Sequence, residues 1–281
     1  MPEDMVDPEG RPVNAVYGFA RFLGDLLESA RPRYVGVAFD ESLKDSFRNQ
    51  IYPPYKANRE PPPLALVEQF ARCRQLCLPL GLTAHSSDQF EADDIIGTWT
   101  EQARRQGHPV VVVTKDKDLS QLIRPGDVFW DFSGSQRYAY DDIATRFGAV
   151  PERMADYLAL TGDAVDNIPG VPGIGPKTAT QLLESFSDLE SIYQNLEAVS
   201  GLPLRGAARV HAKLLEHRDK AFQASELTRV FCEAPLPDEA QALARRKPDL
   251  SDLDALYSQA GFGTALRRQA ERFSAHAYWS E

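Results

Sequence analysis

The chain has 281 residues, of which 43% are hydrophobic, so it can bury a full core as one large domain or as one domain with an appendage. No apolar run reaches the roughly 20 residues that span a bilayer, and the acidic first residues carry no secretory signal, so we expect a cytoplasmic protein without a membrane partner. The net charge of −10 argues against a general binder of polyanions, although carboxylates around divalent cations would offset part of it.

The first half of the chain alternates predicted helices and strands. Apolar residues at helical spacing predict a helix from Asn14 to Glu28. The apolar run YVGVAF predicts a buried strand from Tyr34 to Phe39 that ends on Asp40. The polar stretch at 41–63 closes with three prolines and is expected to be a mobile surface segment. Helices are predicted at residues 64–77 and 90–105, with a short strand between them and further strands at 109–113 and 128–132.

The second half of the chain is predicted to be helical. The expected helices span residues 151–160, 176–185, 189–196, 205–216 and 220–230, with a further one at 250–260. Strands that alternate with helices indicate a mostly parallel sheet. The sequence therefore predicts an α/β domain in residues 1–160 and a helical part in residues 161–281.

Acidic residues gather where predicted strands and helices end. Asp40 and Asp116 each follow a strand, and ligands of open α/β sheets bind beyond the carboxyl ends of strands. The segment FEADDIIG places three acids at a helix start, where helix-start acids are the ordinary explanation. Three acids so close together repel one another unless a cation neutralises them. The candidate metal ligands are Asp40, Glu91, Asp93, Asp94, Asp116, Asp118, Asp163 and Asp166.

Two pairs among these acids have their own alternatives. Asp163 and Asp166 lie at the end of a predicted helix, where carboxylates are unfavourable against the helix dipole and a metal would compensate. Asp116 and Asp118 alternate with lysines, which is also typical of an exposed charged loop. Oxygen ligands without histidine or cysteine favour Mg²⁺ or Mn²⁺, and two such ions suit phosphoryl transfer.

Taken in order, these segments resemble the 5′-nuclease family, which includes flap endonucleases and the 5′-nuclease domain of bacterial DNA polymerase I. The resemblance extends from Gly10 to about Val230. Its most specific pieces are AFDESLKDSFR, YPPYKANREPPP, FEADDIIGT, VTKDKDLSQLI and LTGDAVDNIPGVPGIGPKTA. It implies a PIN-like α/β fold with a helical C-terminal part that binds DNA.

The resemblance implies roles for the candidate acids. It places six of them around a first metal ion and the pair Asp163 and Asp166 at a second. The retention of that pair makes the chain resemble the polymerase-associated branch, because a variant branch of bacterial flap endonucleases has lost the second-site acids.

The resemblance also implies nucleic-acid contacts. The segment at 42–63 matches the family's arch over the active site, in which Lys56 and Arg59 are implied catalytic residues. Lysine and arginine can neutralise phosphates and Tyr55 could stack on an unpaired base, whereas a solvated loop is the plain alternative. GVPGIGPKTA resembles a helix–hairpin–helix element whose glycines let backbone N–H groups approach a phosphate, and the hairpin carbonyls could hold K⁺. The predicted DNA contacts are Arg48, Tyr55, Lys56, Arg59, Gly173, Gly175, Lys177 and Thr178.

One feature of the family has no counterpart in the sequence. Family members open with an apolar strand that ends in an aspartate of the first metal site, whereas Asp4 and Asp7 follow no apolar run. Either the chain is truncated or it lacks this strand and ligand. We expect truncation, because loss of a central strand would expose neighbouring edges and apolar faces.

The sequence predicts a monomeric, metal-dependent 5′-3′ exonuclease or flap endonuclease. It would hydrolyse 5′-flap, nicked or branched DNA in replication or repair. The alternative is a structure-specific DNA-binding protein whose catalysis is impaired by the missing first ligand. A phosphatase or ribonuclease that also uses aspartates at strand ends is a more distant alternative, because fold alone does not determine the substrate.

Overall fold

The structure is a computed structural model that describes residues 4–41, 46–236 and 240–275. The chain forms two compact units, each assembled from separate stretches. The first comprises Met1–Asp40, Pro61–Ser87 and Pro235–Glu281, and the second comprises Glu41–Glu60 and Asp88–Ala234. These units are defined by which residues pack together. The division predicted at residue 160 is defined instead by the change from mixed to helical structure.

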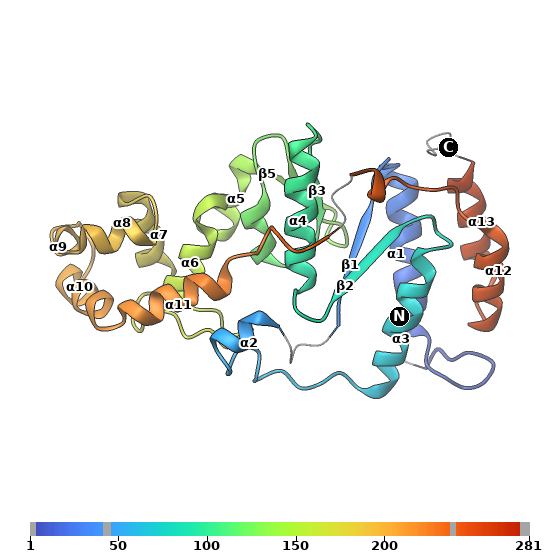
Figure 1. Ribbon diagram of the computed structural model, residues 1–281, viewed down its shortest axis with the longest axis horizontal. Coiled ribbons are helices and arrows are strands. Elements are labelled where there is room, and N and C mark those ends of the chain that lie inside the picture. Colours follow the sequence, from blue (N-terminus) through green and yellow to red (C-terminus); the bar gives the residue numbers. More distant parts are fainter. Residues whose placement is uncertain (1–3, 42–45, 237–239, 276–281) are drawn as a thin grey trace. The chain divides into compact units, whose positions relative to one another are not determined.

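The first unit contains a two-stranded parallel sheet covered by helices (Figure 1). Strand β1 (Gly36–Asp40) pairs with β2 (Thr83–Ser87), so that Asp40 lies opposite Ser87. Helix α1 (Asn14–Ala30) buries a stripe of apolar side chains at three- to four-residue spacing and packs against α3 (Leu64–Cys77). The remaining elements of this unit are η3 (Ala240–Leu243), α12 (Leu250–Gln259) and α13 (Thr264–Ser274).

The second unit contains a three-stranded sheet. Strand β3 (Val111–Val113) pairs in parallel with β4 (Val128–Asp131), and β4 pairs antiparallel with β5 (Gln136–Ala139). The described strands therefore form two separate sheets, where the sequence predicted one mostly parallel sheet. The other elements near this sheet are α2 (Phe47–Ile51), α4 (Ala92–Arg105), the 3₁₀ helix η1 (Lys117–Leu122) and α5 (Tyr140–Phe147).

The rest of the second unit is helical, as predicted. Helix α6 (Met154–Thr161) lies at its centre and packs against both α7 (Pro176–Ser185) and α11 (Arg218–Thr228). Every side chain from Met154 to Leu160 is buried, which is expected of a helix enclosed on all sides. The remaining elements are η2 (Pro151–Arg153), α8 (Leu189–Gln194), α9 (Leu196–Val199) and α10 (Ala207–Glu216).

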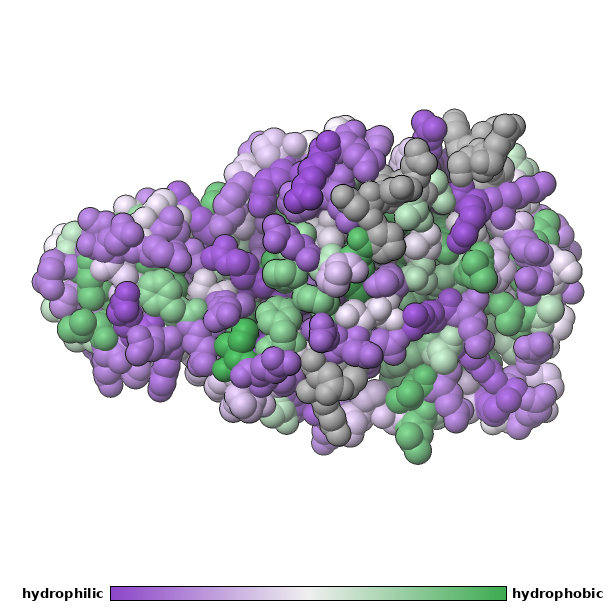
Figure 2. Space-filling view, in the orientation of Figure 1, coloured by the Kyte–Doolittle hydropathy of each residue, from purple (hydrophilic) through white to green (hydrophobic). Residues whose placement is uncertain are grey.

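The surface in Figure 2 is mostly hydrophilic, with hydrophobic residues in small scattered patches. Isolated apolar residues on a surface are normal and need no partner. Among the described residues, no helix is both long and apolar enough to cross a membrane.

Replacing Leu158 with alanine should destabilise the second unit strongly. Its side chain is 1% exposed, so Leu158→Ala leaves a cavity and should lower the free energy of unfolding by about 2–5 kcal/mol. The matched control is Leu215→Ala, because Leu215 is 60% exposed and its loss should change stability by less than about 0.5 kcal/mol. Urea unfolding followed by circular dichroism measures both, and equal losses would contradict the central position of α6.

Candidate active site

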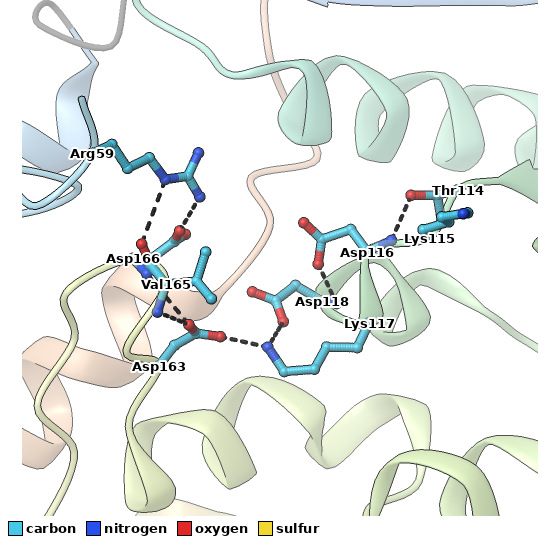
Figure 3. Close-up of a pocket in the computed structure, with 9 residues that line it drawn as sticks. All are labelled: Arg59, Thr114, Lys115, Asp116, Lys117, Asp118, Asp163, Val165 and Asp166. Atoms are coloured by element: carbon cyan, nitrogen blue, oxygen red, sulfur yellow. Dashed lines mark hydrogen bonds and ion pairs between the residues drawn. The ribbon is translucent and has the colours of Figure 1, made fainter. Parts of the chain in front are cut away.

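Four of the predicted acids line one pocket of the second unit. Figure 3 shows Asp116 and Asp118 on one side of it and Asp163 and Asp166 on the other. The cavity has a volume of about 580 Å³. Its remaining lining residues are Arg59, Thr114, Lys115, Lys117 and Val165. The fold thus brings together two pairs of acids that lie far apart in the sequence.

The end of β3 positions the first pair. The Thr114 side-chain oxygen accepts a hydrogen bond of 3.0 Å from the Asp116 backbone N–H. Asp116 then caps the 3₁₀ helix η1, because its Oδ1 accepts from the Asp118 N–H at 3.0 Å. The apolar side chains of η1 are buried, and this burial fixes the turn on which both carboxylates stand.

A tight loop after α6 positions the second pair. Asp163 and Ile168 exchange two backbone hydrogen bonds of 2.8 Å. Asp163 Oδ1 also accepts from the Val165 and Asp166 N–H groups, at 2.8 and 3.3 Å. Gly170 closes this loop at φ +63°, and a Cβ there would lie 2.3 Å from the Gly162 nitrogen. Only glycine therefore fits this position.

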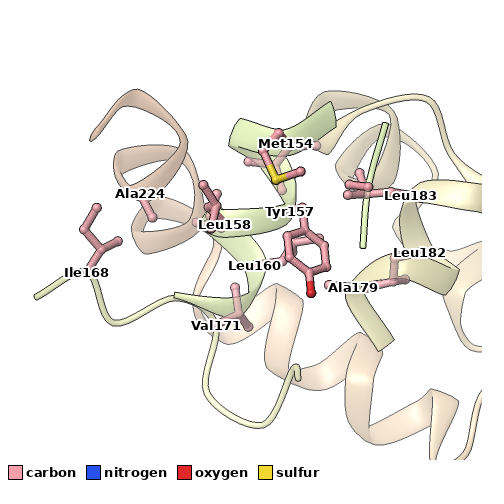
Figure 4. Packing of buried hydrophobic residues seen from close by; sticks show 14 of the residues in the cluster. Met154, Tyr157, Leu158, Leu160, Ile168, Val171, Ala179, Leu182, Leu183 and Ala224 are labelled. Carbon is pink, nitrogen blue, oxygen red and sulfur yellow. The ribbon is translucent and has the colours of Figure 1, made fainter. Parts of the chain in front are cut away.

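Buried apolar residues anchor the same loop. Figure 4 shows Val171 beside Leu160 of α6 and Ile168 on the side of Ala224 of α11, and both belong to the buried cluster that includes Leu158 and Leu160. The Val171 N–H donates to the Leu160 carbonyl at 3.0 Å. The acidic loop is thus attached to the centre of the helical part.

Lys117 neutralises acids from both pairs. Its Nζ lies 3.0 Å from Asp118 Oδ1 and also forms an ion pair with Asp163. Burial alone would lower the pKa of Lys117, but the carboxylates of Asp118 and Asp163 outweigh it and raise that pKa. In the sequence this lysine is only one member of a loop of alternating charge, because the pattern cannot show which acids a lysine will face.

The two acids bound by Lys117 titrate differently. Burial, with the nearby charge of Asp116, raises the pKa of Asp118 to about 6, despite Lys117. Burial also opposes ionisation of Asp163, but Lys117 and two backbone N–H groups outweigh it and lower the pKa of that carboxyl. Of the two acids that Lys117 contacts, Asp118 is therefore the one whose charge the fold compensates less.

Glu91 receives hydrogen bonds from the segment that was predicted to form an arch. Its side chain is 7% exposed, and its Oε2 lies 2.7 Å from the Lys56 Nζ. The Tyr55 hydroxyl is 3.1 Å from the same oxygen and 3.1 Å from Asp166 Oδ2. Arg59 forms an ion pair with Asp166. Lys56 and Arg59 thus lie beside predicted metal ligands.

Tyr55 has a different environment from the one that base stacking requires. Its side chain is 4% exposed and belongs to the main hydrophobic cluster, so its ring faces are covered. Burial, together with the carboxylates of Glu91 and Asp166, raises the pKa of Tyr55. The hydroxyl therefore keeps its proton and acts as a buried donor.

The remaining predicted acids lie in three different environments. Asp94 is fully buried and pairs with Arg48, which is only 3% exposed. Asp93 is partly buried in the first turn of α4. Asp40 ends β1, as expected, and is exposed in the first unit.

The acids of the second unit have the chemistry of a site for hard cations. Within the described ranges, no three acids, histidines or cysteines converge to hold a metal ion, and lysines and arginines contact the pocket carboxylates instead. Glu91 Oε1 is buried and has no hydrogen-bond partner among the residues that the structure describes. A buried acceptor of this kind is costly unless a cation or water satisfies it, so the residues present fit a divalent ion.

The predicted hairpin is open to solvent. Gly173 has φ +87° and Gly175 caps α7, and neither has a neighbour within 4 Å of the position that a Cβ would take. Pro176 is the first residue of α7, Lys177 is exposed and Thr178 is partly exposed. A phosphate could therefore approach the N–H groups at the start of this helix.

An α/β fold with carboxylates at a strand end, followed by helices that present an open glycine hairpin, is typical of a nuclease. The chain belongs to the 5′-3′ exonuclease family. Residues 1–148 match its N-terminal resolvase-like domain, and residues 149–251 match its C-terminal SAM fold.

Individual relatives agree with this assignment. The chain is 31% identical to a 5′-3′ exonuclease of Buchnera aphidicola, over 87% of this chain and 85% of that protein. It is 37% identical to DNA polymerase I of Rhizobium leguminosarum over 94% of this chain. The chain spans only 26% and 30% of the length of the polymerases from Rhizobium leguminosarum and Bacillus subtilis.

Solved structures share the fold. The T5 D15 protein co-crystallised with metal ions has a TM-score of 0.64 at 21% identity, over 92% of this chain and 89% of that one. The catalytic core of Rad2 in complex with a DNA substrate has a TM-score of 0.59 at 15% identity, over 96% of this chain and 87% of that one.

Asp118→Asn should stabilise the metal-free protein at neutral pH. The folded-state pKa of Asp118, about 6, lies above its ordinary value of 3.8, so the folded state binds more protons than the unfolded state between these values. Its contribution to stability is therefore complete below about pH 4 and is lost as the pH rises through about 6. A rise of about 2 in pKa corresponds to roughly 3 kcal/mol.

Thermal unfolding in EDTA at pH 5 and pH 8 measures this effect. The variant should gain up to about 3 kcal/mol over the wild type at pH 8 and less at pH 5. Asp252→Asn is the control, because Asp252 is an exposed aspartate of the first unit and does not contribute to the pKa of Asp118. A variant that is less stable than the wild type at pH 8 would contradict the unfavourable charge of Asp118.

Proposed function

We propose that this chain is a metal-dependent 5′-nuclease that hydrolyses phosphodiester bonds of 5′-flap, nicked or branched DNA. The observation that supports this most directly is the pocket, in which two pairs of aspartates face Lys117 and Arg59. Family membership supports a nuclease, and the acid-rich pocket supports a metal-assisted reaction.

The proposed metal ligands are the acids of the second unit. Oxygen donors without histidine or cysteine favour Mg²⁺ or Mn²⁺. Two such ions would supply positive charge that stabilises an in-line displacement at phosphorus. The unpartnered oxygen of Glu91 supports its inclusion. The assignment of Asp40 to this site stays a prediction from the sequence. The proposed set in the second unit is Glu91, Asp93, Asp116, Asp118, Asp163 and Asp166.

Lys56 and Arg59 are the proposed catalytic residues that neutralise the reacting phosphate. Lys56 is nearly buried against Glu91, whereas the Arg59 side chain is 36% exposed beside Asp166. Both cations lie where a phosphate bound next to these acids would need positive charge. A bound phosphate could compete with these carboxylates for the N–H groups of Lys56 and Arg59.

The hairpin is the proposed second contact with DNA. Gly173 and Gly175 leave the start of α7 uncovered, and Lys177 and Thr178 can add side-chain contacts to a phosphate. A K⁺ ion held by the hairpin carbonyls stays a prediction from the resemblance. A monomer is sufficient for the proposed reaction, because both DNA contacts lie in one chain.

Cleavage of a 5′-flap substrate tests the proposed function. Purified protein with Mg²⁺ or Mn²⁺ should cut near the junction, and EDTA should abolish the cut. Lys56→Ala and Arg59→Ala should each slow cleavage by about 100-fold or more, because each removes a preorganised charge from the transition state. The control is Lys247→Ala, which removes an exposed lysine of the first unit.

Two results would contradict the proposal in different ways. No cleavage of flap, nicked or gapped duplexes by a protein that still binds them in a gel shift would favour the alternative, a DNA-binding protein with impaired catalysis. Preference for RNA in a competition assay would favour a ribonuclease.

Lys177→Ala should weaken DNA binding through loss of one phosphate contact. The logarithm of the affinity should fall less steeply with the logarithm of the salt concentration, by about one in slope. Fluorescence anisotropy across a series of KCl concentrations, with the metal replaced by Ca²⁺, measures both affinity and slope. An unchanged slope would show that the hairpin lysine does not contact a phosphate, and Lys247→Ala again provides the control.

A further inference from the structure

We propose that Asp94 and Arg48 form a positioning pair that holds the Tyr55–Lys56 segment against the acid pocket. The sequence assigned Asp94 to the metal and Arg48 to DNA. The geometry points to neither contact. This inference rests on the proposed nuclease function, because the segment it positions carries the proposed catalytic cations.

Asp94 has no acceptor site left for a metal ion. Its Oδ1 accepts from the Arg48 Nη2 at 2.7 Å and from the Phe231 N–H at 2.9 Å. Its Oδ2 accepts from the Arg48 Nη1 at 2.7 Å and from the Glu91 N–H at 3.0 Å. A carboxylate offers about four lone-pair sites, so these four hydrogen bonds saturate it. The residue is also 0% exposed.

The hydrogen-bond donors of Arg48 are likewise occupied by groups of the protein. Besides its two bonds to Asp94, its Nε donates to the Leu227 carbonyl at 2.9 Å and its Nη2 donates to the Arg229 carbonyl at 2.9 Å. The two-pronged contact with a carboxylate is the geometry that arginine favours. With 3% of its surface exposed, Arg48 could reach a DNA phosphate only if this network broke.

The pair joins three stretches of the second unit. Arg48 lies on α2 and Asp94 lies in the first turn of α4. The two carbonyls belong to the last turn of α11 and to the residue that follows it. The pair therefore ties the short helix α2 to two long helices. A five-residue helix has little stability of its own and depends on such contacts.

Both members of the pair help to position Lys56. Arg48 fixes α2, which ends five residues before Lys56, and the Lys56 N–H then donates to the Asp166 carbonyl at 3.0 Å. Asp94 fixes the backbone of Glu91, whose carboxylate accepts from the Lys56 Nζ. The donor and the acceptor of this ion pair are thus placed by the two members of one buried pair.

Metal affinity separates a positioning residue from a ligand. Asp94→Asn and the matched variant Asp163→Asn each replace a buried aspartate by its isosteric amide. In DNA-free protein titrated with Mn²⁺ and followed by electron paramagnetic resonance, Asp163→Asn should weaken the affinity strongly because it removes a ligand. Asp94→Asn should weaken the affinity far less, because it removes no ligand and only loosens the backbone of Glu91. If Asp94→Asn weakens Mn²⁺ binding as much as Asp163→Asn does, Asp94 is a ligand and the proposal is overturned.

Amide hydrogen exchange reports the position of the segment directly. In Asp94→Asn and Arg48→Gln, the amides of residues 46–60 should exchange faster than in the wild type, while Asp163→Asn should leave the amides of residues 46–51 unchanged. Cleavage by Asp94→Asn should fall by about 100-fold through kcat, since a displacement of about 1 Å can have that effect. Unchanged exchange in residues 46–60 would overturn the proposal even if cleavage fell.

A double-mutant cycle tests whether the two residues act as one unit. The combined variant Arg48→Gln/Asp94→Asn should cleave about as slowly as the worse single variant, because both changes remove the same interaction. Multiplicative losses would contradict the pair. Arg48→Lys keeps the charge and one hydrogen bond, and it provides a milder change if a single variant does not fold.

Exchange and Mn²⁺ binding require no cleavage, so failure of the proposed function, seen as an inactive wild type, is distinguishable from failure of this inference.

Discussion

Repulsion among carboxylates is the constraint on which the second unit depends. Asp116 and Asp118 on one side of the pocket face Asp163 and Asp166 on the other, and like charges at such a site disfavour one another's ionised forms. Lys117 lies between the two sides and contacts one acid from each. Burial raises the pKa of Asp118 and the charges of Asp116 and Asp163 add to this rise, so Lys117 offsets only part of the cost of ionising that carboxyl.

The fold holds these acids in place with contacts that lie outside the pocket. The Asp163 loop is fastened to α6 by backbone hydrogen bonds and by the burial of Ile168 and Val171. The Asp116 turn is fastened by the apolar side chains of η1. Apolar burial thus offsets an unfavourable arrangement of charge, and active sites often have such strain because function requires it.

The sequence predicted those elements whose residues have a strong local pattern. The helices at Leu64–Cys77 and Pro176–Ser185 have the predicted bounds, because apolar periodicity and prolines mark them. No residue pattern predicted β5 or α5. Strand β5 is short and largely polar and is formed by pairing with β4. Such pairing depends on tertiary contacts that periodicity does not show.

The candidate site was predictable by residue type but not by environment. The pocket contains the predicted acids of two segments, since strand and helix ends place them there. Tyr55, Arg48 and Asp94 are the residues whose environments the sequence did not indicate. An arginine in a polar segment looks like a phosphate contact, and only the structure shows that its donors are already committed to Asp94 and two carbonyls.

The charge of the pocket also differs from the charge of the chain. A net charge of −10 suggests poor affinity for DNA. The pocket itself is lined by four aspartates and by three cations, Arg59, Lys115 and Lys117, which leaves a net charge of only −1. Two divalent ions would make it +3, and screening by salt limits the influence of distant carboxylates to about 10 Å. The local balance of charge, and not the total, therefore decides whether a phosphate can bind at this site.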